Sequence, residues 1–343
     1  MPSGQAAVGD LDALLALARE AGPGMTNLPA DHARLAERLD GSVAALAAQA
    51  PPNDAAIILV AELGGHVVGC AGVFPRVGES RPFYSFRVTR LPHSSRELGR
   101  FESVDVLQMV DEYSGASELG MLYLSSPHRR GGNGSVLSRS RFLLIASRPT
   151  LFAARVFAEM RGVSDQTGRS PFWDAVGRHF FDMDFVTADR FSAAGHHQFI
   201  ADLMPKHPVY VRLLPAAAQQ VIGEPHPNTA PALSLLEREG FRYEGCVDVF
   251  DAGPTVHCPR DQIRTIAASE RVQIADIGAR SDTSATCLVA TQAPHPFRLV
   301  AADVVRDERG IGINDRVAAA LGVEVGQTVL IASRRRPRTD GRS

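Results

Sequence analysis

The stretch that most constrains the fold is residues 117–147, SELGMLYLSSPHRRGGNGSVLSRSRFLLIAS. Residues 119–124 are an almost continuous apolar run, which is typical of a strand buried on both faces. Pro127 ends this run, and a basic, glycine-rich segment follows at residues 129–135. From Val136 the apolar period becomes helical. One face carries Val136, Leu137, Ser140, Leu143, Leu144 and Ser147, whereas Ser138, Arg139 and Phe142 lie elsewhere. The stretch therefore predicts a strand, a basic loop and an amphipathic helix.

The loop in this unit has the chemistry of an anion site. The first N–H groups of a helix have no internal partner, and the helix dipole adds about half a positive charge there. Glycines let the backbone approach a phosphate closely, and neighbouring arginines add full charges. The loop therefore predicts a pyrophosphate cradle made of Arg129, Arg130, Gly132, Asn133, Gly134 and Ser135. The alternative is a strand–helix connection that is merely basic.

The spacing within the loop separates it from other phosphate motifs. It lacks the Gly-Lys-Ser/Thr of a Walker loop and the Gly-x-Gly-x-x-Gly of a dinucleotide fingerprint. Arg129-x-x-Gly132-x-Gly134 instead resembles the Arg/Gln-x-x-Gly-x-Gly/Ala pattern of the GNAT superfamily of CoA-dependent N-acyltransferases. The resemblance implies an α/β fold with a mixed, twisted sheet flanked by helices. It also implies that Leu122 and Leu124, on the preceding strand, offer backbone groups to the pantetheine of CoA.

The amino-acid composition limits the classes of function that the chain can have. The chain has 343 residues, 45% of them hydrophobic and 22% charged, with a net charge of −2. These values are typical of a soluble globular protein and argue against general nucleic-acid binding. No apolar run is long enough to span a bilayer and no signal peptide is present, so we expect a cytoplasmic protein without membrane association. Four scattered cysteines without a Cys-x-x-Cys predict free thiols and no metal site.

The remaining pattern up to residue 269 predicts alternating helices and strands. Helices are expected at residues 10–20, 31–49, 170–180, 197–204, 215–221 and 231–238. Strands are expected at residues 56–62, 66–75, 83–89, 153–160, 185–186 and 242–250, whereas residues 91–115 are ambiguous. Residues 228–241 resemble the helix–strand corner that closes a GNAT sheet, and residues 170–181 have a similar outline. Either segment could close the sheet.

The character of the chain changes near residue 270. Aromatic residues become rare and short Val/Ile runs follow one another, which predicts a small all-β barrel at residues 270–333. Residues 334–343 are rich in arginine and are predicted to be a disordered basic tail. We therefore expect a GNAT-like domain at residues 1–269, with elaborations at about 183–225, followed by the barrel and the tail.

Long motifs in the second half resemble one family closely. They are AEMRG at 158–162, SPFW at 170–173, ADLMPKHP at 201–208 and GE-x-HP-x-TAP at 223–231. Together they resemble the arginine N-succinyltransferase family, over most of residues 22–332. The resemblance implies direct transfer of the succinyl group of succinyl-CoA to the α-amine of L-arginine. It implies succinyl-CoA as co-substrate, no tightly bound cofactor, and a homo- or hetero-oligomer, because some members are subunits of hetero-oligomers and also accept ornithine.

The resemblance also assigns roles to residues. His226, in the His-Pro-x-Thr-Ala-Pro motif, matches the family's proton donor, and Leu122 matches its succinyl-CoA contact. A histidine could equally act as base toward the amine. Residues 1–7 depart from the family because they make a poor first strand, so that the edge strand could be lost. Gly131 stands where an acidic or polar residue is common, which should only loosen the loop.

Other candidates come from chemistry. Glu159, at the end of a strand, could act as base or hold the substrate guanidinium. Arg87 and Arg161 could pair with the succinyl carboxylate, the alternative being structural salt bridges. Asp248 and Asp251 could bind the arginine side chain, but they are interpreted as turn caps. A related enzyme acting on ornithine or another amine or acyl-CoA, and a non-catalytic partner subunit, stay open as alternatives.

Overall fold

The computed structural model describes residues 1–22, 25, 27–47, 55–80, 82–193, 198–278, 285–293 and 295–334. Within them the strands join in one sheet of order β12-β15-β11-β14-β13-β1-β2-β3-β6-β7-β10-β9-β4-β5-β8. The strands are β1 (Ser3–Gln5), β2 (Ile57–Leu63), β3 (His66–Phe74), β4 (Ser85–Ser95), β5 (Arg100–Val110), β6 (Ser117–Leu124), β7 (Arg155–Glu159), β8 (Val209–Tyr210), β9 (Arg242–Val247), β10 (Pro254–Pro259), β11 (Glu270–Ile277), β12 (Ala285–Ala290), β13 (Arg298–Asp307), β14 (Gly310–Ile313) and β15 (Thr328–Ser333).

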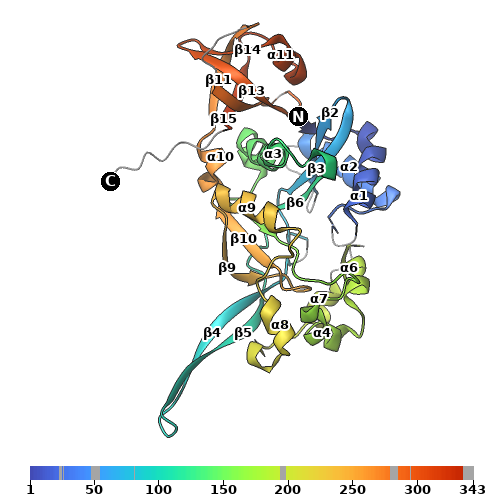
Figure 1. Ribbon diagram of the computed structural model, residues 1–343, viewed down its shortest axis with the longest axis vertical. Helices are drawn as coiled ribbons and strands as arrows, with labels where there is room; N and C mark the ends of the chain where they lie inside the picture. Colours follow the sequence, from blue (N-terminus) through green and yellow to red (C-terminus); the bar gives the residue numbers. More distant parts are fainter. Residues whose placement is uncertain are drawn as a thin grey trace.

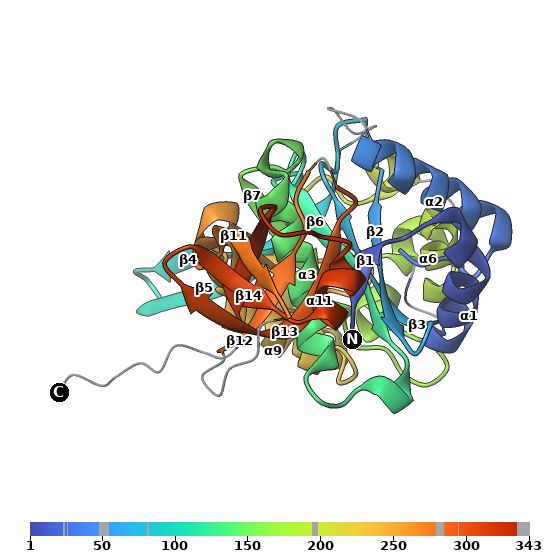
Figure 2. The same ribbon diagram turned by 90° about the horizontal axis from the view of Figure 1, so that it is seen from above.

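Helices cover both faces of the central strands. They are α1 (Leu11–Ala21), α2 (His32–Ala47), α3 (Asn133–Ser147), α4 (Pro171–Ala175), α5 (Arg178–Phe181), α6 (Phe185–Ala193), α7 (Gln198–Leu203), α8 (Ala216–Val221), α9 (Ala230–Glu239), α10 (Arg264–Ala267) and α11 (Asp315–Leu321). Figure 2 shows α1 and α2 on one side of β2 and β3, and α3 on the other. The expected mixed, twisted α/β sheet flanked by helices is confirmed.

The N-terminal residues do form a strand. β1 has only three residues, yet it pairs antiparallel with both β2 and β13. The expectation that the poor sequence could cost the chain its edge strand was wrong, because β1 lies inside the sheet and its backbone is held on both sides. It joins the central strands to the C-terminal barrel.

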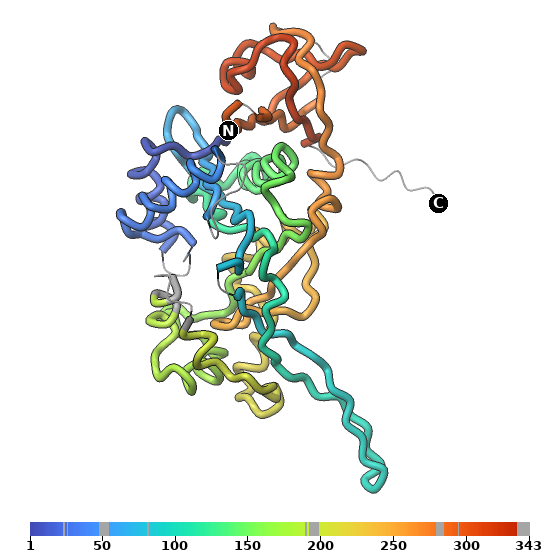
Figure 3. Tube along the Cα trace, turned by 180° about the vertical axis from the view of Figure 1, so that it is seen from behind, coloured from blue at the N-terminus to red at the C-terminus, as the bar shows by residue number. Residues whose placement is uncertain are grey.

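The ambiguous residues 91–115 belong largely to a long hairpin. β4 and β5 pair continuously from Ser85↔Val110 to Ser95↔Arg100. Figures 1 and 3 show this hairpin as an arm that projects from the body of the molecule. Both strands are largely exposed toward the tip, where Leu98 and Phe101 face solvent. The weak apolar alternation of this segment follows from that exposure, because few of its residues face a core.

The loop-bearing unit folds as β6, a loop and α3, but α3 is not amphipathic. Ser138, Arg141 and Phe142 are buried together with the expected apolar face. The prediction of a solvent-facing side was wrong because α3 is enclosed by several neighbours. It packs against β2, β3 and β6, and also against α10 and the barrel strand β12.

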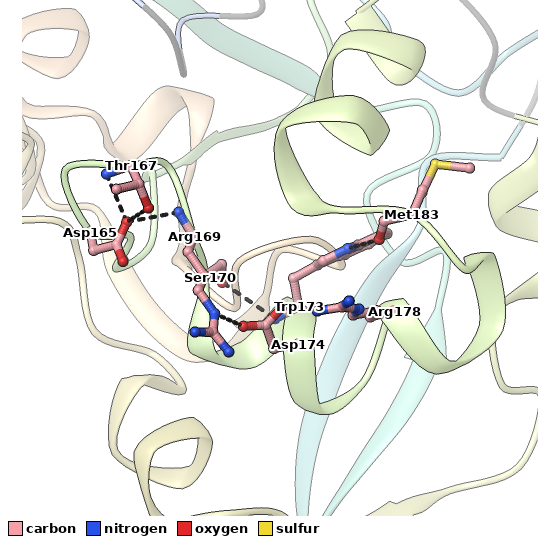
Figure 4. A network of polar contacts seen from close by, with 8 residues as sticks. All are labelled: Asp165, Thr167, Arg169, Ser170, Trp173, Asp174, Arg178 and Met183. Atoms are coloured by element: carbon pink, nitrogen blue, oxygen red, sulfur yellow. Dashed lines mark hydrogen bonds and ion pairs between the residues drawn. The ribbon is translucent and has the colours of Figure 1, made fainter.

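The segment after β7 begins with a well-capped helix. The Ser170 side chain accepts a hydrogen bond from the Trp173 N–H at 3.3 Å, and Trp173 Nε1 donates to the Met183 carbonyl at 2.9 Å (Figure 4). Arg169 and Arg178 both pair with Asp174 (Figure 4). The single helix expected here is divided into α4 and α5, and the strand expected at residues 185–186 is instead the start of α6.

The corner that closes the sheet is the second of the two candidates. α9 ends at Gly240 with φ +105°, and β9 follows directly and pairs with β10, which in turn pairs with β7. The earlier corner leads into α6 and contributes no strand at that point. Gly240 takes the left-handed conformation that lets the chain leave the helix and enter the strand.

The C-terminal strands close into the expected small barrel. The order β12-β15-β11-β14-β13 closes through an additional β12–β13 pairing, and Figure 1 shows this barrel at the end of the molecule opposite the hairpin.

Arg334 was assigned to a disordered tail, but its Nη2 donates to the Gly131 carbonyl at 2.7 Å. Residues 335–343 lie outside the described residues. No helix in the described part of the chain is long and apolar enough to cross a membrane.

Candidate active site

The central strands separate next to the basic loop. β6 and β7 are parallel partners only at Ser117↔Val156 and Glu118↔Phe157. Beyond Glu118 the described residues of β6 have no partner on the β7 side, although they continue to pair with β3. The sheet therefore opens into a V between β6 and β7, and the backbone of Leu122 is available there for a ligand.

A bulge marks the middle of the open strand. The β3–β6 register shifts between Cys70 and Gly72, and Met121 has φ +53°. A non-glycine residue in this conformation is strained by roughly 1–2 kcal/mol, and such strain gathers where a strand must redirect its groups. The bulge thus turns the β6 backbone at the point where the V opens.

A cavity of about 450 Å³ occupies this V. Its lining includes residues 118–122 of β6, residues 158–161 at the end of β7 and residues 248–251 of the turn before β10. One residue each of α2, α3, α6 and α7 and two residues of α9 also line it. Residues from both faces of the sheet line one cavity, so the cavity passes through the sheet. Leu122 lies on its wall, whereas Leu124 does not line it and is buried against Leu137.

The loop between β6 and α3 is shaped as an anion cradle. Gly131 and Gly132 have φ +63° and +78°, and α3 begins directly after them. In the described part of the chain, no acceptor takes the N–H groups of Gly134 and Ser135. The Asn133 side chain is engaged, since its Nδ2 donates to the His128 carbonyl at 3.1 Å. The site thus offers free backbone donors at a helix N-terminus.

Two arginines flank these donors differently. Arg129 Nε donates to the Leu124 carbonyl at 2.7 Å, and its guanidinium lies over the Tyr123 ring at 5.3 Å. Arg129 thus braces the loop against the end of β6. Arg130 is exposed and adds positive charge at the mouth. Arg334 from the barrel also reaches this loop, a contact that sequence reasoning missed because it joins residues 203 positions apart.

A group of carboxylates lies on the other side of the cavity. Glu159 Oε1 is buried and has no hydrogen-bond partner among the described residues. Burial, with the nearby carboxylates of Asp248, Glu118 and Asp251, raises the pKa of Glu159 well above its ordinary value. Glu159 shares a hydrogen bond with Asp248, whose pKa burial also raises. Carboxylates gathered in this way favour a cationic ligand.

The two aspartates of this group also cap the turn before β10. Asp248 Oδ1 accepts from the N–H groups of Phe250 and Asp251 at 2.7 and 2.9 Å. Asp251 accepts from Gly162 and Gly253 at 2.7 and 2.9 Å. The turn-cap interpretation therefore holds for both residues. Asp248 and Asp251 in addition line the cavity together with Glu159, so the alternative that they bind the arginine side chain also stays open.

His226 lies beside the cavity on a loop held against β7. Its backbone N–H donates to the Arg161 carbonyl at 2.7 Å. Its Nδ1 accepts from the Asn228 N–H at 3.1 Å, so the neutral ring carries its proton on Nε2. Partial burial and the charge of Arg161 lower the pKa of His226. His226 does not itself line the cavity, but its neighbours Arg161 and Thr229 do.

The two arginines proposed for the succinyl carboxylate have different positions. Arg161 lines the cavity, and its Nη2 donates to Ser164 Oγ at 2.9 Å. Arg87 does not line the cavity. Its guanidinium pairs with Glu112, and its Nη1 donates to the Glu244 carbonyl at 2.9 Å. The structural salt bridge is therefore the reading that the geometry favours for Arg87.

Sequence reasoning missed three charged residues that line the cavity, namely Arg38 on α2, Glu118 on β6 and Arg141 on α3. Arg141 is the most deeply buried of them. The residue is only 2% exposed, and among the described residues its guanidinium donates only to the carbonyl and Oγ of Ser138, one helix turn away. The signal was present in the sequence, because Arg141 lies one turn from Leu137 and from Leu144 on the apolar side of the helix.

Within the described residues, no group of three or more His, Cys, Asp or Glu is placed to hold a metal ion.

Comparisons with known proteins agree with this architecture. The chain matches the family described as "Arginine N-succinyltransferase beta subunit" over residues 5–265, and the C-terminal domain of that subunit over residues 270–333. The arginine N-succinyltransferases of Escherichia coli O139:H28 and Shigella flexneri are each 41% identical over 295 residues, which is 85% of this chain and 86% of theirs.

A solved structure extends the likeness to the whole fold. Subunit AI of the arginine/ornithine succinyltransferase from Pseudomonas aeruginosa superposes with a TM-score of 0.86 at 34% identity, covering 97% of this chain and 98% of that one. The match includes the central sheet and the barrel. By sequence and by fold, the chain belongs to the arginine N-succinyltransferase family.

Proposed function

We propose that this chain transfers the succinyl group of succinyl-CoA to the α-amine of L-arginine. The observation that carries the proposal is the cavity in the β6–β7 opening. An anion cradle lies at the end of β6, and buried carboxylates lie on the far wall. This division of charge suits an anionic donor and a cationic acceptor that meet at the opening. We assign the transfer to residues 1–269, including the elaboration at about 183–225, and treat residues 270–333 as a separate barrel.

The donor would bind along the β6–α3 unit. The free N–H groups of Gly134 and Ser135 would bind the pyrophosphate, with Arg129 and Arg130 adding charge. The pantetheine would then run along the open edge of β6, past Leu122, toward the bulge at Met121. Its amides would replace the missing strand partner, because the backbone groups of an open strand need acceptors and donors. The thioester then lies near the middle of the cavity.

The acceptor would bind on the carboxylate side. A guanidinium or an ammonium group would supply the countercharge that Glu159 and Asp248 lack. Glu159 is also suited to receive the amine proton, because a carboxylate with a raised pKa is a better base near neutral pH. Glu159 could thus hold the arginine, accept its proton, or do both in turn.

His226 is better suited to donate than to accept. Its Nδ1 already accepts a hydrogen bond, so the ring presents Nε2–H to a reacting group. Nε2–H can stabilise the thiolate of CoA as it departs, which fits the donor role implied by the family motif. The alternative role as base would require the proton to move to Nδ1 and the hydrogen bond from Asn228 to be lost.

The reaction is a direct transfer. The neutral α-amine attacks the thioester carbonyl carbon, a C–N bond forms and the C–S bond breaks. The amine loses one proton to the base, and the CoA thiolate takes one proton to leave as the thiol. Both substrates fit one cavity from opposite faces, so both should be bound before chemistry. Initial-rate plots should therefore intersect, and parallel lines would exclude this scheme.

Ornithine is the second acceptor to consider. The Pseudomonas aeruginosa relative is named for both arginine and ornithine, and it is named as a subunit. Ornithine also carries a side-chain cation that the carboxylate group could bind. A homo- or hetero-oligomeric assembly and a cytoplasmic location complete the proposal. The latter is supported by the four cysteines, which are free and buried, as suits a reducing compartment.

A two-by-two activity assay tests the function. Purified full-length protein is supplied with succinyl-CoA or acetyl-CoA and with L-arginine or L-ornithine, and the released thiol is measured. We expect the highest kcat/KM for succinyl-CoA with arginine. Activity with acetyl-CoA equal to that with succinyl-CoA would contradict the assigned donor, and a preference for ornithine would replace the assigned acceptor. No activity with any pair would favour a non-catalytic partner subunit.

A further inference from the structure

Arg141 is a buried cation that has no countercharge among the described residues. Its guanidinium donates to the Ser138 carbonyl at 3.2 Å and to Ser138 Oγ at 2.9 Å, and Nη1 donates to no described residue. No carboxylate of the described chain forms an ion pair with it. Burial alone lowers the pKa of Arg141 to about 9, so the group stays charged near neutral pH. Its neighbour Arg139, by contrast, pairs with Glu239 at 3.5 Å.

An unpaired buried charge is costly, and it calls for an explanation. Removing an ion from water costs several kcal/mol when no partner offsets the loss. The cost suggests that the partner of Arg141 arrives from outside the chain. Arg141 lines the same cavity as the β6 opening, so an anion that enters this cavity can reach the guanidinium.

The level of Arg141 along the helix decides which anion reaches it. α3 starts at the loop and returns antiparallel to β6, as a helix between two parallel strands must. Arg141 is eight residues beyond Asn133, so it lies about 12 Å from the pyrophosphate cradle at 1.5 Å per residue. A comparable distance of about 10 Å along β6, at about 3.3 Å per residue, leads from Leu124 back to the bulge at Met121. Arg141 is therefore level with the acyl group, not with the pyrophosphate.

Arg141 and the carboxylates that suit the acceptor lie on opposite faces of the sheet. Alternation along β7 places Ala158 in the cluster that contains Leu144 of α3, and Phe157 in the cluster that contains Leu14 of α1. Glu159 has the same parity as Phe157, so it projects to the α1 side. The carboxylates that suit the acceptor thus face away from α3, and the anion that meets Arg141 belongs to the donor.

We propose that Arg141 binds the terminal carboxylate of the succinyl group and so selects succinyl-CoA over acyl-CoA donors without that carboxylate. The assignment rests on the proposed succinyltransferase function and adds a specificity-determining residue to it. A planar guanidinium offers paired N–H donors that match a carboxylate. The carboxylate would also remove the free-energy cost of the unpaired charge on Arg141. The same ion pair would therefore strengthen donor binding and select the donor.

The test compares Arg141→Met with Arg139→Met, variants of a buried and a partly buried arginine of one helix that differ in whether the guanidinium is paired. Thermal unfolding of each is measured without ligand, with succinyl-CoA and with acetyl-CoA. We expect Arg139→Met to lower the Tm, because it leaves Glu239 unpaired. We expect Arg141→Met to leave the ligand-free Tm unchanged or higher. The extra stabilisation that succinyl-CoA gives the wild type over acetyl-CoA should disappear in Arg141→Met only.

Steady-state kinetics complete the test. In Arg141→Met, kcat/KM for succinyl-CoA should fall about 10²–10³-fold, with little change for acetyl-CoA and in the KM for arginine. Arg141→Lys should recover only part of the loss, because an ammonium lacks the planar fork. Equal losses with both acyl-CoA donors would overturn the proposal in favour of a structural role, and a rise confined to the KM for arginine would assign Arg141 to the acceptor.

The two proposals can fail separately. A wild type that transfers no succinyl group, yet is stabilised by succinyl-CoA more than by acetyl-CoA in an Arg141-dependent way, would overturn the function but keep the carboxylate site. A wild type that prefers succinyl-CoA, with the preference intact in Arg141→Met, would keep the function and overturn the site.

Discussion

The two walls of the cavity are built in different ways. The donor wall comes from one contiguous stretch, β6, the loop and α3, in which strand, glycines and helix follow one another. The acceptor wall is assembled from the end of β7, the turn before β10 and the loop that carries His226, which are far apart in the sequence. The donor wall offers backbone N–H groups and arginines, whereas the acceptor wall offers mainly carboxylates together with Arg161.

The two walls have different tasks. Interactions that every CoA thioester would make lie at the loop, whereas interactions that select and position the reacting groups lie elsewhere in the cavity. In the proposed function, the contiguous cradle would recognise the part of the donor that is common to all acyl-CoA molecules, and Arg141 on α3 of the same wall would meet the acyl group. The assembled wall would meet the acceptor and position the protons. Substitutions in the loop should therefore act on donor binding, whereas substitutions in the acceptor wall should act on chemistry and on the acceptor.

The largest effect is expected at His226. Replacing it with alanine should lower kcat about 10²–10⁴-fold, because Nε2–H would no longer stabilise the departing thiolate. The KM for succinyl-CoA should change little. Steady-state rates of His226→Ala are compared with those of His66→Ala, a variant at the exposed start of β3. A loss of tenfold or less would mean that His226 only positions its loop.

Glu159 should give the next largest effect. Glu159→Gln keeps the shape of the side chain but removes the charge, so kcat/KM for arginine should fall about 10²–10³-fold. The KM for the acyl-CoA donor should stay within a factor of about three. Glu112→Gln serves as a control, since Glu112 pairs with Arg87 outside the cavity. If Glu159→Gln weakened donor binding instead, the separation of the two walls would be broken.

Arg129 should affect the donor alone. Arg129→Met removes the brace between the loop and the Leu124 carbonyl, so the cradle loses its shape and one positive charge. We expect the KM for succinyl-CoA and for acetyl-CoA to rise together, about tenfold. The KM for arginine should not move. Arg96→Met, at the tip of the β4–β5 hairpin, is the matched surface variant. An effect that depended on the acyl group would contradict a cradle for the shared part of CoA.

The smallest effect concerns stability and pH. The pKa of Glu159 is raised in the folded protein, so its contribution to stability is fully present below the ordinary carboxyl pKa and is lost as pH rises through the raised value. Glu159→Gln removes that loss. The ligand-free variant should therefore melt a few degrees higher than the wild type near pH 8, with almost no gain near pH 4. Thermal scans across this range check it, and a gain that did not depend on pH would point to packing instead.

Much of the fold could be predicted because its signals are local. The apolar run of β6, the glycines of the loop, the Ser170 cap and the Gly240-Phe241 corner each specify a piece of backbone within a few residues. The errors arose where tertiary context prevailed. The helix face of α3 was misjudged because the barrel and α10 cover it, and β1 forms because two neighbouring strands hold it.

The candidate site, like the fold, has parts that local sequence specifies and parts that depend on tertiary structure. The pattern Arg129-x-x-Gly132-x-Gly134 is contiguous, so the sequence alone specifies a helix N-terminus that can bind an anion. Only the tertiary structure decides that β6 and β7 part beyond Glu118, that Glu159 meets Asp248, and that Arg141 is enclosed without a carboxylate. Charge and burial act through space, and the cost or benefit of a buried ionised group depends on neighbours that the sequence does not place beside it.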